Sequence, residues 1–190
     1  MDRDYYLSII KNRMGERRYI HSVNVSKAAV KLAEIYGADV KKAELAGILH
    51  DSCKEIDKKL MLQIISNGGI ILDDTQKHSS KLWHAIAGSV YVRDTLGIND
   101  DDIINSIRYH TSGRANMSIL EKIIFTADFI SEEREYDGVE IMRKKAYRDI
   151  DEAMLFGLEF TISNLARHNK LIHRDAVDCY NEILIKRKAV

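Results

Sequence analysis

A histidine–aspartate doublet, His50-Asp51, stands near the end of an apolar helical segment. Four more residues able to bind a metal flank it at wide spacing, namely His21, His84, His110 and Asp128. Imidazole and carboxylate groups together suit transition-metal ions. With 7 histidines in the chain, one doublet carries little weight alone. Its significance depends on where these six side chains lie on their helices.

Each of the six residues begins, ends or interrupts an apolar helical stripe. His21 opens a series that continues through Val25, Ala28, Leu32 and Ile35, with the spacing of a core-facing stripe. The other stripes are Ala43, Ala46 and His50; His84, Ala87, Gly88 and Tyr91; Ile103, Ile107 and His110; and Ile124, Phe125 and Asp128. The polar side chains are therefore expected to point into the protein.

A single histidine on an apolar face is more often a hydrogen-bonded core residue than a metal ligand. Six inward polar residues are harder to explain in that way, because each one buried without a partner costs roughly 1–3 kcal/mol. A shared cation would compensate all of them at once. The pattern therefore predicts a metal site built from His21, His50, Asp51, His84, His110 and Asp128.

Helical periodicity runs through almost the whole chain, and no segment alternates with a period of two for long enough to predict a strand. Helices are expected at about 4–14, 17–36, 39–50, 58–66, 100–110, 118–128, 139–148, 150–169 and 175–188. One more should hold Trp83 and His84 after a cap at Ser79 or Ser80, and 70–77 is expected to be a loop. The predicted class is all-α.

Local signals mark several helix ends. Gly37 suits a left-handed C-cap, and Asp39 suits the N-cap of the helix that follows. Ser118 and Glu121 have the spacing of a capping box.

The bulk composition is that of an ordinary globular protein. The 190 residues are enough for one domain, expected to span 1–190, and 29 basic residues balance 29 acidic ones. This balance gives no hint of a nucleic-acid polymer or a membrane as partner. Cys53 and Cys179 do not resemble a disulfide framework, and neither a secretory signal nor a membrane-length apolar run is recognisable. A cytoplasmic location is expected.

In its histidine and aspartate pattern the chain resembles the HD superfamily of metal-dependent phosphohydrolases. The superfamily pattern is a histidine, a His-Asp doublet and a distant aspartate, which fits His21, His50-Asp51 and Asp128. His84 and His110 resemble the two extra histidines of members that hold two metal ions.

Longer motifs are similar to those of the bacterial HD-type symmetrical bis(5′-nucleosyl)-tetraphosphatases. They are Arg18-Tyr19-Ile20-His21, His50-Asp51-Ser52-Cys53-Lys54, Leu82-Trp83-His84, His110-Thr111-Ser112-Gly113 and Lys122-Ile123-Ile124-Phe125-Thr126-Ala127-Asp128. This resemblance implies a single HD-type helical bundle with a metal-site core at about 17–138 and additional C-terminal helices. It also implies the symmetrical hydrolysis of diadenosine tetraphosphate to two ADP, with iron or a similar metal.

The ligand types suit iron, manganese, cobalt, nickel or zinc, and the resemblance favours iron. In two-metal sites the ions lie roughly 3.5–4 Å apart and commonly share a bridging carboxylate, for which Asp51 is the candidate. His21, His50 and Asp128 would complete the coordination of one ion, and His84 and His110 that of the other. Such ions lower the pKa of a bound water, which can then attack phosphorus.

A tetraphosphate bridge carries about four negative charges, so further cations should line the site. Lys54, one turn after His50, is the expected catalytic cation beside Asp51. The residues expected to bind substrate are Arg18, Thr111, Arg114 and Arg134.

Two alternatives remain open at this point. The chain could be another HD nucleotide phosphohydrolase, either a nucleotidase or a guanosine-alarmone hydrolase, with the same metal site and different pocket walls. It could also be a non-catalytic HD-like signalling domain, which would not need all six ligands. The expected partner is a dinucleoside polyphosphate or nucleotide, and a homodimer is left open.

Overall fold

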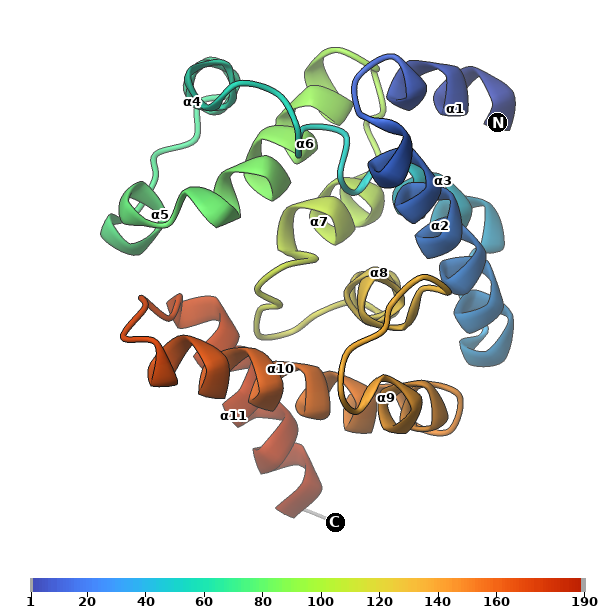
Figure 1. Cartoon of the computed structure of the whole chain (residues 1–190), viewed down its shortest axis with the longest axis vertical. Coiled ribbons are helices and arrows are strands. Elements are labelled where there is room, and N and C mark those ends of the chain that lie inside the picture. The colour runs from blue at the N-terminus through green and yellow to red at the C-terminus, as the bar shows by residue number, and fades with distance from the viewer. Residues whose placement is uncertain (1, 189–190) are drawn as a thin grey trace.

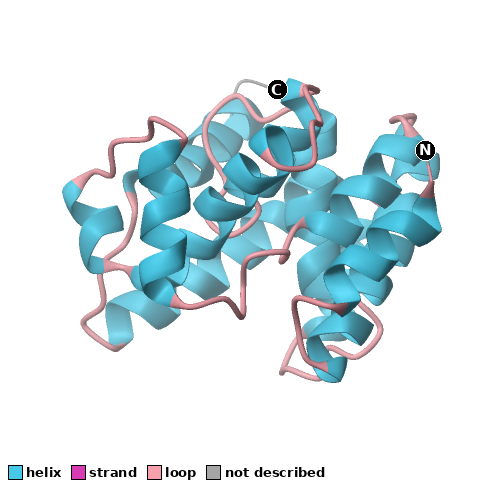
Figure 2. Ribbon diagram, turned by 90° about the horizontal axis from the view of Figure 1, so that it is seen from above, coloured by secondary structure: helices cyan, strands magenta, loops and turns pink. Residues whose placement is uncertain are grey.

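The computed structural model describes residues 2–188. Within that range every regular element is a helix (Figure 2). In chain order they are α1 (Arg3–Lys11), α2 (Glu16–Tyr36), α3 (Val40–Leu49), α4 (Lys58–Asn67), α5 (Asp74–His78), the 3-10 helix η1 (Ser80–Leu82), α6 (Trp83–Asp94), α7 (Asp101–Tyr109), α8 (Ile119–Ile130), α9 (Val139–Ala146), α10 (Ile150–Arg167) and α11 (Arg174–Lys188). The all-α prediction is confirmed. No helix in the described part is long and apolar enough to cross a bilayer.

Helix α8 lies between two groups of helices (Figure 1). On one side it contacts α2, α3 and α7, and on the other it contacts α9 and α10. α2 packs along α3, α6 packs on α7, and α11 packs on α10. The elements that carry the candidate ligands thus form one connected group, which α6 joins through α7, whereas α9 to α11 cover the far side of α8.

Two clusters of buried apolar side chains meet on α8. The larger one includes Val25 and Ile124, and the smaller one, under α10 and α11, includes Phe125 and Met154. Ile124 and Phe125 are adjacent in sequence, so the two clusters join through α8. A single domain over residues 1–190 stays a prediction, and this continuity supports it.

Several predicted helix ends are confirmed. Gly37 ends α2 in the left-handed region with φ of 68°, where a side chain would be strained. The Asp39 carboxylate accepts hydrogen bonds from two backbone N–H groups at the start of α3. Ser118 and Glu121 form the expected capping box at the start of α8.

The prediction of a loop over 70–77 is wrong in its second half. Residues Asp74–His78 form α5, which begins with a capping box between Asp73 and Gln76. The cap expected at Ser79 or Ser80 is also wrong, because η1 runs directly into α6 and neither serine caps α6. A five-residue helix carries too little apolar periodicity to be recognised, and its capping box was the only local signal.

The apolar stripe expected on α2 is correct in its first part only. Val25 and Leu32 are fully buried, whereas Ile35 is 45% exposed. The buried face is centred on Val25, Ala29 and Leu32, because α3 and α8 cover α2 from two directions. At roughly 100° per residue, Ile35 falls at the edge of that face.

Gly47 is where α3 comes closest to α2. A Cβ atom on Gly47 would lie 2.6 Å from the Ser26 Cα and 3.0 Å from its backbone nitrogen. The Ser26 hydroxyl also donates to the Glu44 carbonyl on α3 at 3.0 Å. The two helices that carry His21 and His50 are therefore locked at a separation that only glycine allows.

We expect Gly47→Ala to destabilise the protein by about 1–2 kcal/mol, because overpacking against backbone outweighs the helix propensity of alanine. The measurement is urea unfolding of metal-free protein, followed by circular dichroism. Gly157→Ala in α10 is the matched control, since its Cβ would meet the flexible end of Met142 instead. Equal or higher stability of Gly47→Ala would contradict the close approach.

Candidate metal centre

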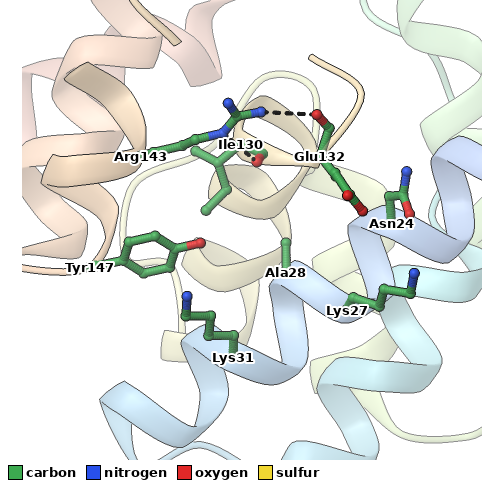
Figure 3. A pocket seen from close by; sticks show the side chains of 8 residues that line it. All are labelled: Asn24, Lys27, Ala28, Lys31, Ile130, Glu132, Arg143 and Tyr147. Atoms are coloured by element: carbon green, nitrogen blue, oxygen red, sulfur yellow. Dashed lines mark hydrogen bonds between the residues drawn. The ribbon is translucent and has the colours of Figure 1, made fainter. Parts of the chain in front are cut away.

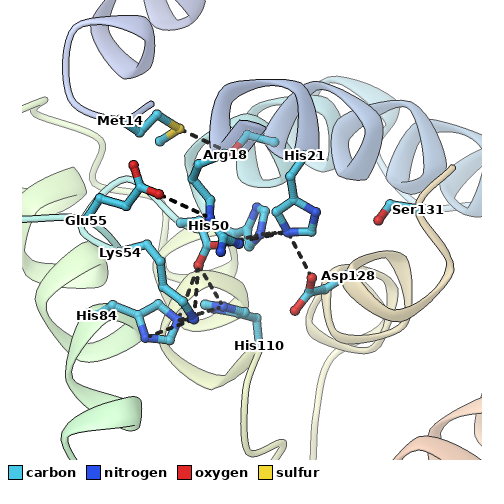
Figure 4. Close-up of polar contacts among 12 residues, drawn as sticks. Met14, Arg18, His21, His50, Lys54, Glu55, His84, His110, Asp128 and Ser131 are labelled. Carbon is cyan, nitrogen blue, oxygen red and sulfur yellow. Dashed lines mark hydrogen bonds and ion pairs between the residues drawn. The ribbon is translucent and has the colours of Figure 1, made fainter. Parts of the chain in front are cut away.

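The structure brings all six predicted ligand residues to one place. They are His21 on α2, His50 and Asp51 just after α3, His84 on α6, His110 just after α7 and Asp128 on α8. Their donor atoms form three overlapping groups within 4.8 Å, each suited to an ion. The Asp128 side chain is 19% exposed, and the other five residues are buried. Figure 4 shows the side chains of the four histidines and Asp128 converging from separate helices.

Asp51 lies between two pairs of histidines. Its Oδ2 atom is 3.6 Å from His50 Nε2 and 3.8 Å from His21 Nε2. Its Oδ1 atom is 3.2 Å from His84 Nε2 and 3.6 Å from His110 Nε2. One carboxylate oxygen therefore faces each pair, which is the arrangement that a bridging ligand requires.

The nitrogens within each pair are also close. Nε2 of His21 and Nε2 of His50 are 3.3 Å apart, and Nε2 of His84 and Nε2 of His110 are also 3.3 Å apart. Two nitrogens that each lie about 2.1 Å from one tetrahedral ion are separated by about 3.4 Å. The spacing of each pair thus fits two ligands of a common ion.

His50 and His110 are oriented by the helices they follow. Each is the C-cap residue of its helix, and each ring Nδ1 lies 2.7 Å from a carbonyl oxygen three residues earlier, that of Gly47 or Ile107. Because a carbonyl can only accept, Nδ1 carries the proton. The lone pair of Nε2 is then free and points into the cluster.

His21 is oriented by a residue that the sequence analysis missed. Its Nδ1 lies 2.5 Å from Oε1 of Glu133, in the loop after α8. Glu133 is in turn held by the Asn24 amide at 2.9 Å and the Ser131 hydroxyl at 2.7 Å. A carboxylate that fixes the outer nitrogen of a histidine is a common support of metal ligands. In sequence Glu133 is one acidic loop residue beside another, with no periodicity to single it out.

The charge states of four of the six residues suit a cation. Burial lowers the pKa of His50 to about 3 and that of His84 to about 4, so both rings are neutral donors at neutral pH. Burial opposes ionisation of Asp51, but the neighbouring His50, His110 and His84 bring its pKa well below the usual value. The Asp128 carboxyl also has a lowered pKa, because His21 and Arg134 outweigh the effect of burial.

One atom of the cluster lacks a partner among the described residues. Asp51 Oδ1 is buried and makes no hydrogen bond. A buried acceptor without a donor costs about 1–3 kcal/mol, and more when it is charged. A metal ion would satisfy this oxygen, and a set of imidazole and carboxylate ligands is right for a transition metal. The residues therefore fit the group that their pattern predicts.

Three of the predicted cations lie at the edge of the cluster. Arg18 Nη1 is 2.7 Å from Asp51 Oδ2, and Lys54 Nζ is 3.0 Å from His84 Nε2. Arg134 pairs with the Asp128 carboxylate and also donates to its backbone carbonyl at 2.8 Å. Their side chains are between 28% and 37% exposed, so each can also face a ligand that arrives from solvent.

Arg114 is not brought to the cluster. Its guanidinium makes a bidentate ion pair with the buried Glu121, at 2.7 and 2.6 Å, and lies over the Tyr109 ring. The same Glu121 belongs to the capping box of α8. The position of Arg114 therefore indicates a structural role at the start of α8 and does not support its predicted contact with substrate.

A cleft of about 610 Å³ opens beside the His84 end of the cluster. Lys54, His84 and Thr111 line its inner end, and Phe160 and Asn164 of α10 line its outer wall. His78 and His173 also line it. His173 makes a 2.7 Å contact with Asp73 and thereby ties the start of α11 to the start of α5.

Comparison with known proteins agrees with this geometry. The family model described as HD domain matches residues 18–133. The protein of Halalkalibacterium halodurans named "Bis(5'-nucleosyl)-tetraphosphatase, symmetrical" is 42% identical over 99% of this chain and 100% of its own length. The Bacillus subtilis protein of the same name is 41% identical over 95% of this chain and 97% of its own length.

A solved structure from Clostridium acetobutylicum is similar over its whole length. It is described as a predicted HD superfamily hydrolase involved in NAD metabolism, and it is 36% identical, with a TM-score of 0.95 and 98% coverage of both chains. A family match over more than half of the chain and full-length relatives above 40% identity leave one conclusion. This chain belongs to the HD domain family and, within it, to the family of the symmetrical bis(5′-nucleosyl)-tetraphosphatases.

Proposed function

We propose that this chain is a metal-dependent hydrolase that cleaves diadenosine tetraphosphate at its centre and releases two molecules of ADP. The observation that carries the proposal is the position of Asp51, which offers one oxygen to each of two histidine pairs. The name shared by relatives at 42% and 41% identity supports the choice of substrate.

The proposed cofactor is a pair of transition-metal ions, with iron as the first choice and manganese, cobalt, nickel or zinc as alternatives. His21, His50 and Asp128 would hold one ion together with Oδ2 of Asp51. His84 and His110 would hold the other together with Oδ1. Two groups of donor atoms within 4.8 Å support the assignment, His21 with His50 and Asp51, and His84 with His110 and Asp51. Asp128 is assigned to the first ion because its Oδ1 lies 3.0 Å from His21 Nε2. When bound, such ions lower the pKa of a water for attack on phosphorus and stabilise charge on the phosphate oxygens.

The cations at the edge of the cluster would bind the phosphate chain. Two divalent ions against Asp51 and Asp128 leave about two positive charges, whereas the tetraphosphate carries about four negative ones. Arg18, Lys54 and Arg134 supply three more positive charges beside the two carboxylates. A guanidinium has five N–H donors, so Arg18 can keep its contact with Asp51 and still donate to a phosphate oxygen.

The cleft beside His84 would accept one nucleoside end of the substrate. Its volume of about 610 Å³ lies inside the range of about 300–1,000 Å³ that is usual for small-molecule sites. Phe160 is 46% exposed and offers an aromatic surface in its outer wall. The Thr111 hydroxyl is proposed to contact the adjoining phosphate from the inner end.

The proposal also includes the cellular location and the oligomeric state of the enzyme. Cys53 and Cys179 are both free and buried, which supports the expected cytoplasmic location, where thiols stay reduced. A homodimer stays a prediction.

Product analysis tests the reaction itself. We expect ADP as the sole adenine product from diadenosine tetraphosphate, and in ¹⁸O-labelled water one ADP of each pair should carry the label in its terminal phosphate. Attack on a central phosphorus produces this pattern, and mass spectrometry detects it. Release of ATP with AMP would contradict symmetrical cleavage. Faster release of inorganic phosphate from nucleoside monophosphates, or of pyrophosphate from a guanosine alarmone, would favour another HD phosphohydrolase.

Metal content tests the proposed bridge. Protein purified without chelators should hold about two transition-metal ions per chain, and Asp51→Ala should hold fewer than one because it removes a ligand from both. Turnover should fall by about 10³-fold or more. Elemental analysis and a rate assay measure the two effects, with the exposed Asp74→Ala as control. A variant that keeps both ions and its turnover would rule out Asp51 as the bridge, and wild-type protein without metal would favour the signalling domain.

Lys54 is expected to stabilise charge on the phosphates. Lys54→Met should lower kcat/KM by about 10²-fold, which corresponds to about 2.7 kcal/mol of lost transition-state stabilisation. Lys58→Met, at the exposed start of α4, is the matched control. The metal content of both variants should equal that of the wild type. A loss of metal in Lys54→Met would mean that Lys54 supports the ligands instead of the substrate.

A further inference from the structure

Arg143 on α9 binds the backbone of the loop that follows α8. Its guanidinium lies within 3.3 Å of four carbonyl oxygens, those of Ile130, Ser131, Glu132 and Arg134. The shortest of these contacts joins Nη2 and the Ser131 oxygen, at 2.8 Å. Figure 3 shows Arg143 reaching across to Glu132. A lysine could not make all of these contacts, because its three N–H donors all belong to a single nitrogen atom.

The position of this arginine follows from the end of α8. The last carbonyls of a helix have no partner inside the helix, and they carry a partial negative charge. Ile130 is the last residue of α8, and Ser131 is its C-cap. Arg143 supplies donors to both carbonyls. Its side chain is only 22% exposed, so water competes weakly for these contacts.

The side chains of the same loop support the candidate metal centre. Glu133 contacts Nδ1 of His21, and Ser131 donates to Glu133 at 2.7 Å. The neighbouring Arg134 pairs with the Asp128 carboxylate. The backbone of the loop is thus bound by Arg143, whereas its side chains hold two of the proposed ligands.

Three other proposed ligands, His50, His84 and His110, are oriented without this loop. Nδ1 of His50 and Nδ1 of His110 are bonded to carbonyls of their own helices, those of Gly47 and Ile107. His84 lies on α6 and contacts Lys54. Within the described residues, these contacts with backbone carbonyls and Lys54 do not involve residues 131–134.

We infer that Arg143 is a positioning residue of the metal centre, which fixes the loop so that Glu133 orients His21 and Arg134 holds Asp128. The inference rests on the proposed metal centre and extends it. Loss of Arg143 therefore weakens binding of the ion held by His21 and Asp128, and it leaves binding of the ion held by His84 and His110 nearly unaffected.

The test is the titration of metal-free protein with Co²⁺, followed by calorimetry and by the visible absorption of the bound ion. In Arg143→Met one of two sites should lose about 10–100-fold in affinity, which is the usual effect of losing an outer contact of a ligand. The other site should stay within about threefold of the wild type. Glu133→Gln should weaken the same site, and the double variant should lose less than the product of the two single effects, because both act through one contact.

Glu140→Gln is the matched control. It removes the exposed ion-pair partner of Arg143 and leaves the four carbonyl contacts in place. Surface pairs contribute about 0–1 kcal/mol, so both Co²⁺ affinities should stay close to those of the wild type. Arg143→Lys serves as the second variant, because it keeps the charge and should fold even if Arg143→Met does not. It should show the same one-sided loss.

Two results would overturn the inference. One is Co²⁺ binding at both sites with wild-type affinity in the Arg143 variants. The other is an equal weakening of both sites together with a lower unfolding temperature of the metal-free protein, which would mean that Arg143 only stabilises the fold. Wild-type protein that binds no Co²⁺ would instead overturn the proposed metal centre, and this outcome is distinguishable from the other two.

Discussion

The burial of Asp51 among four imidazole rings is the constraint on which the rest of the structure depends. A carboxylate that is 2% exposed, with one oxygen lacking any hydrogen bond among the described residues, is unfavourable unless a cation accompanies it. The fold nevertheless holds it there, because four different helices end or cross at that point. Arg18 and Lys54 offset part of its charge from the solvent side. The fold thus accepts a local loss of stability at the point where the candidate metal ligands come together.

The rings of the candidate histidine ligands are oriented in two physically different ways. His50 and His110 follow directly after helices, and backbone carbonyls of the same helices set their tautomers. His21 depends on Glu133, which arrives from a loop more than 100 residues later in the chain. The first way is local and rigid. The second needs long-range packing. It therefore depends on the close approach of α2 and α3 at Gly47 and on the carbonyl contacts of Arg143.

Much of the site was predictable because side-chain chemistry and helical periodicity are local properties. The six histidine and aspartate residues begin, end or interrupt apolar stripes, and the structure brings all of them together. The same reasoning did not reveal the ion pair of Arg114 with Glu121, because an arginine after a turn can pair with substrate or with a buried carboxylate, and only packing places Glu121 beside it. It also failed for Ile35 and for residues 74–78, whose surroundings depend on neighbouring helices.

The sequence by itself determined the all-α class, most helix ends and the six candidate metal ligands, since each follows from periodicity, capping chemistry or ligand type. Only the tertiary structure decided which oxygen of Asp51 each pair of histidines faces, and which outer groups orient the histidines. Those features depend on directions and distances between helices that are far apart in the chain. A loop carboxylate such as Glu133 or a helix arginine such as Arg143 has no sequence signal that distinguishes it from a solvated neighbour. Its role exists only once α8, α9 and α2 are packed together.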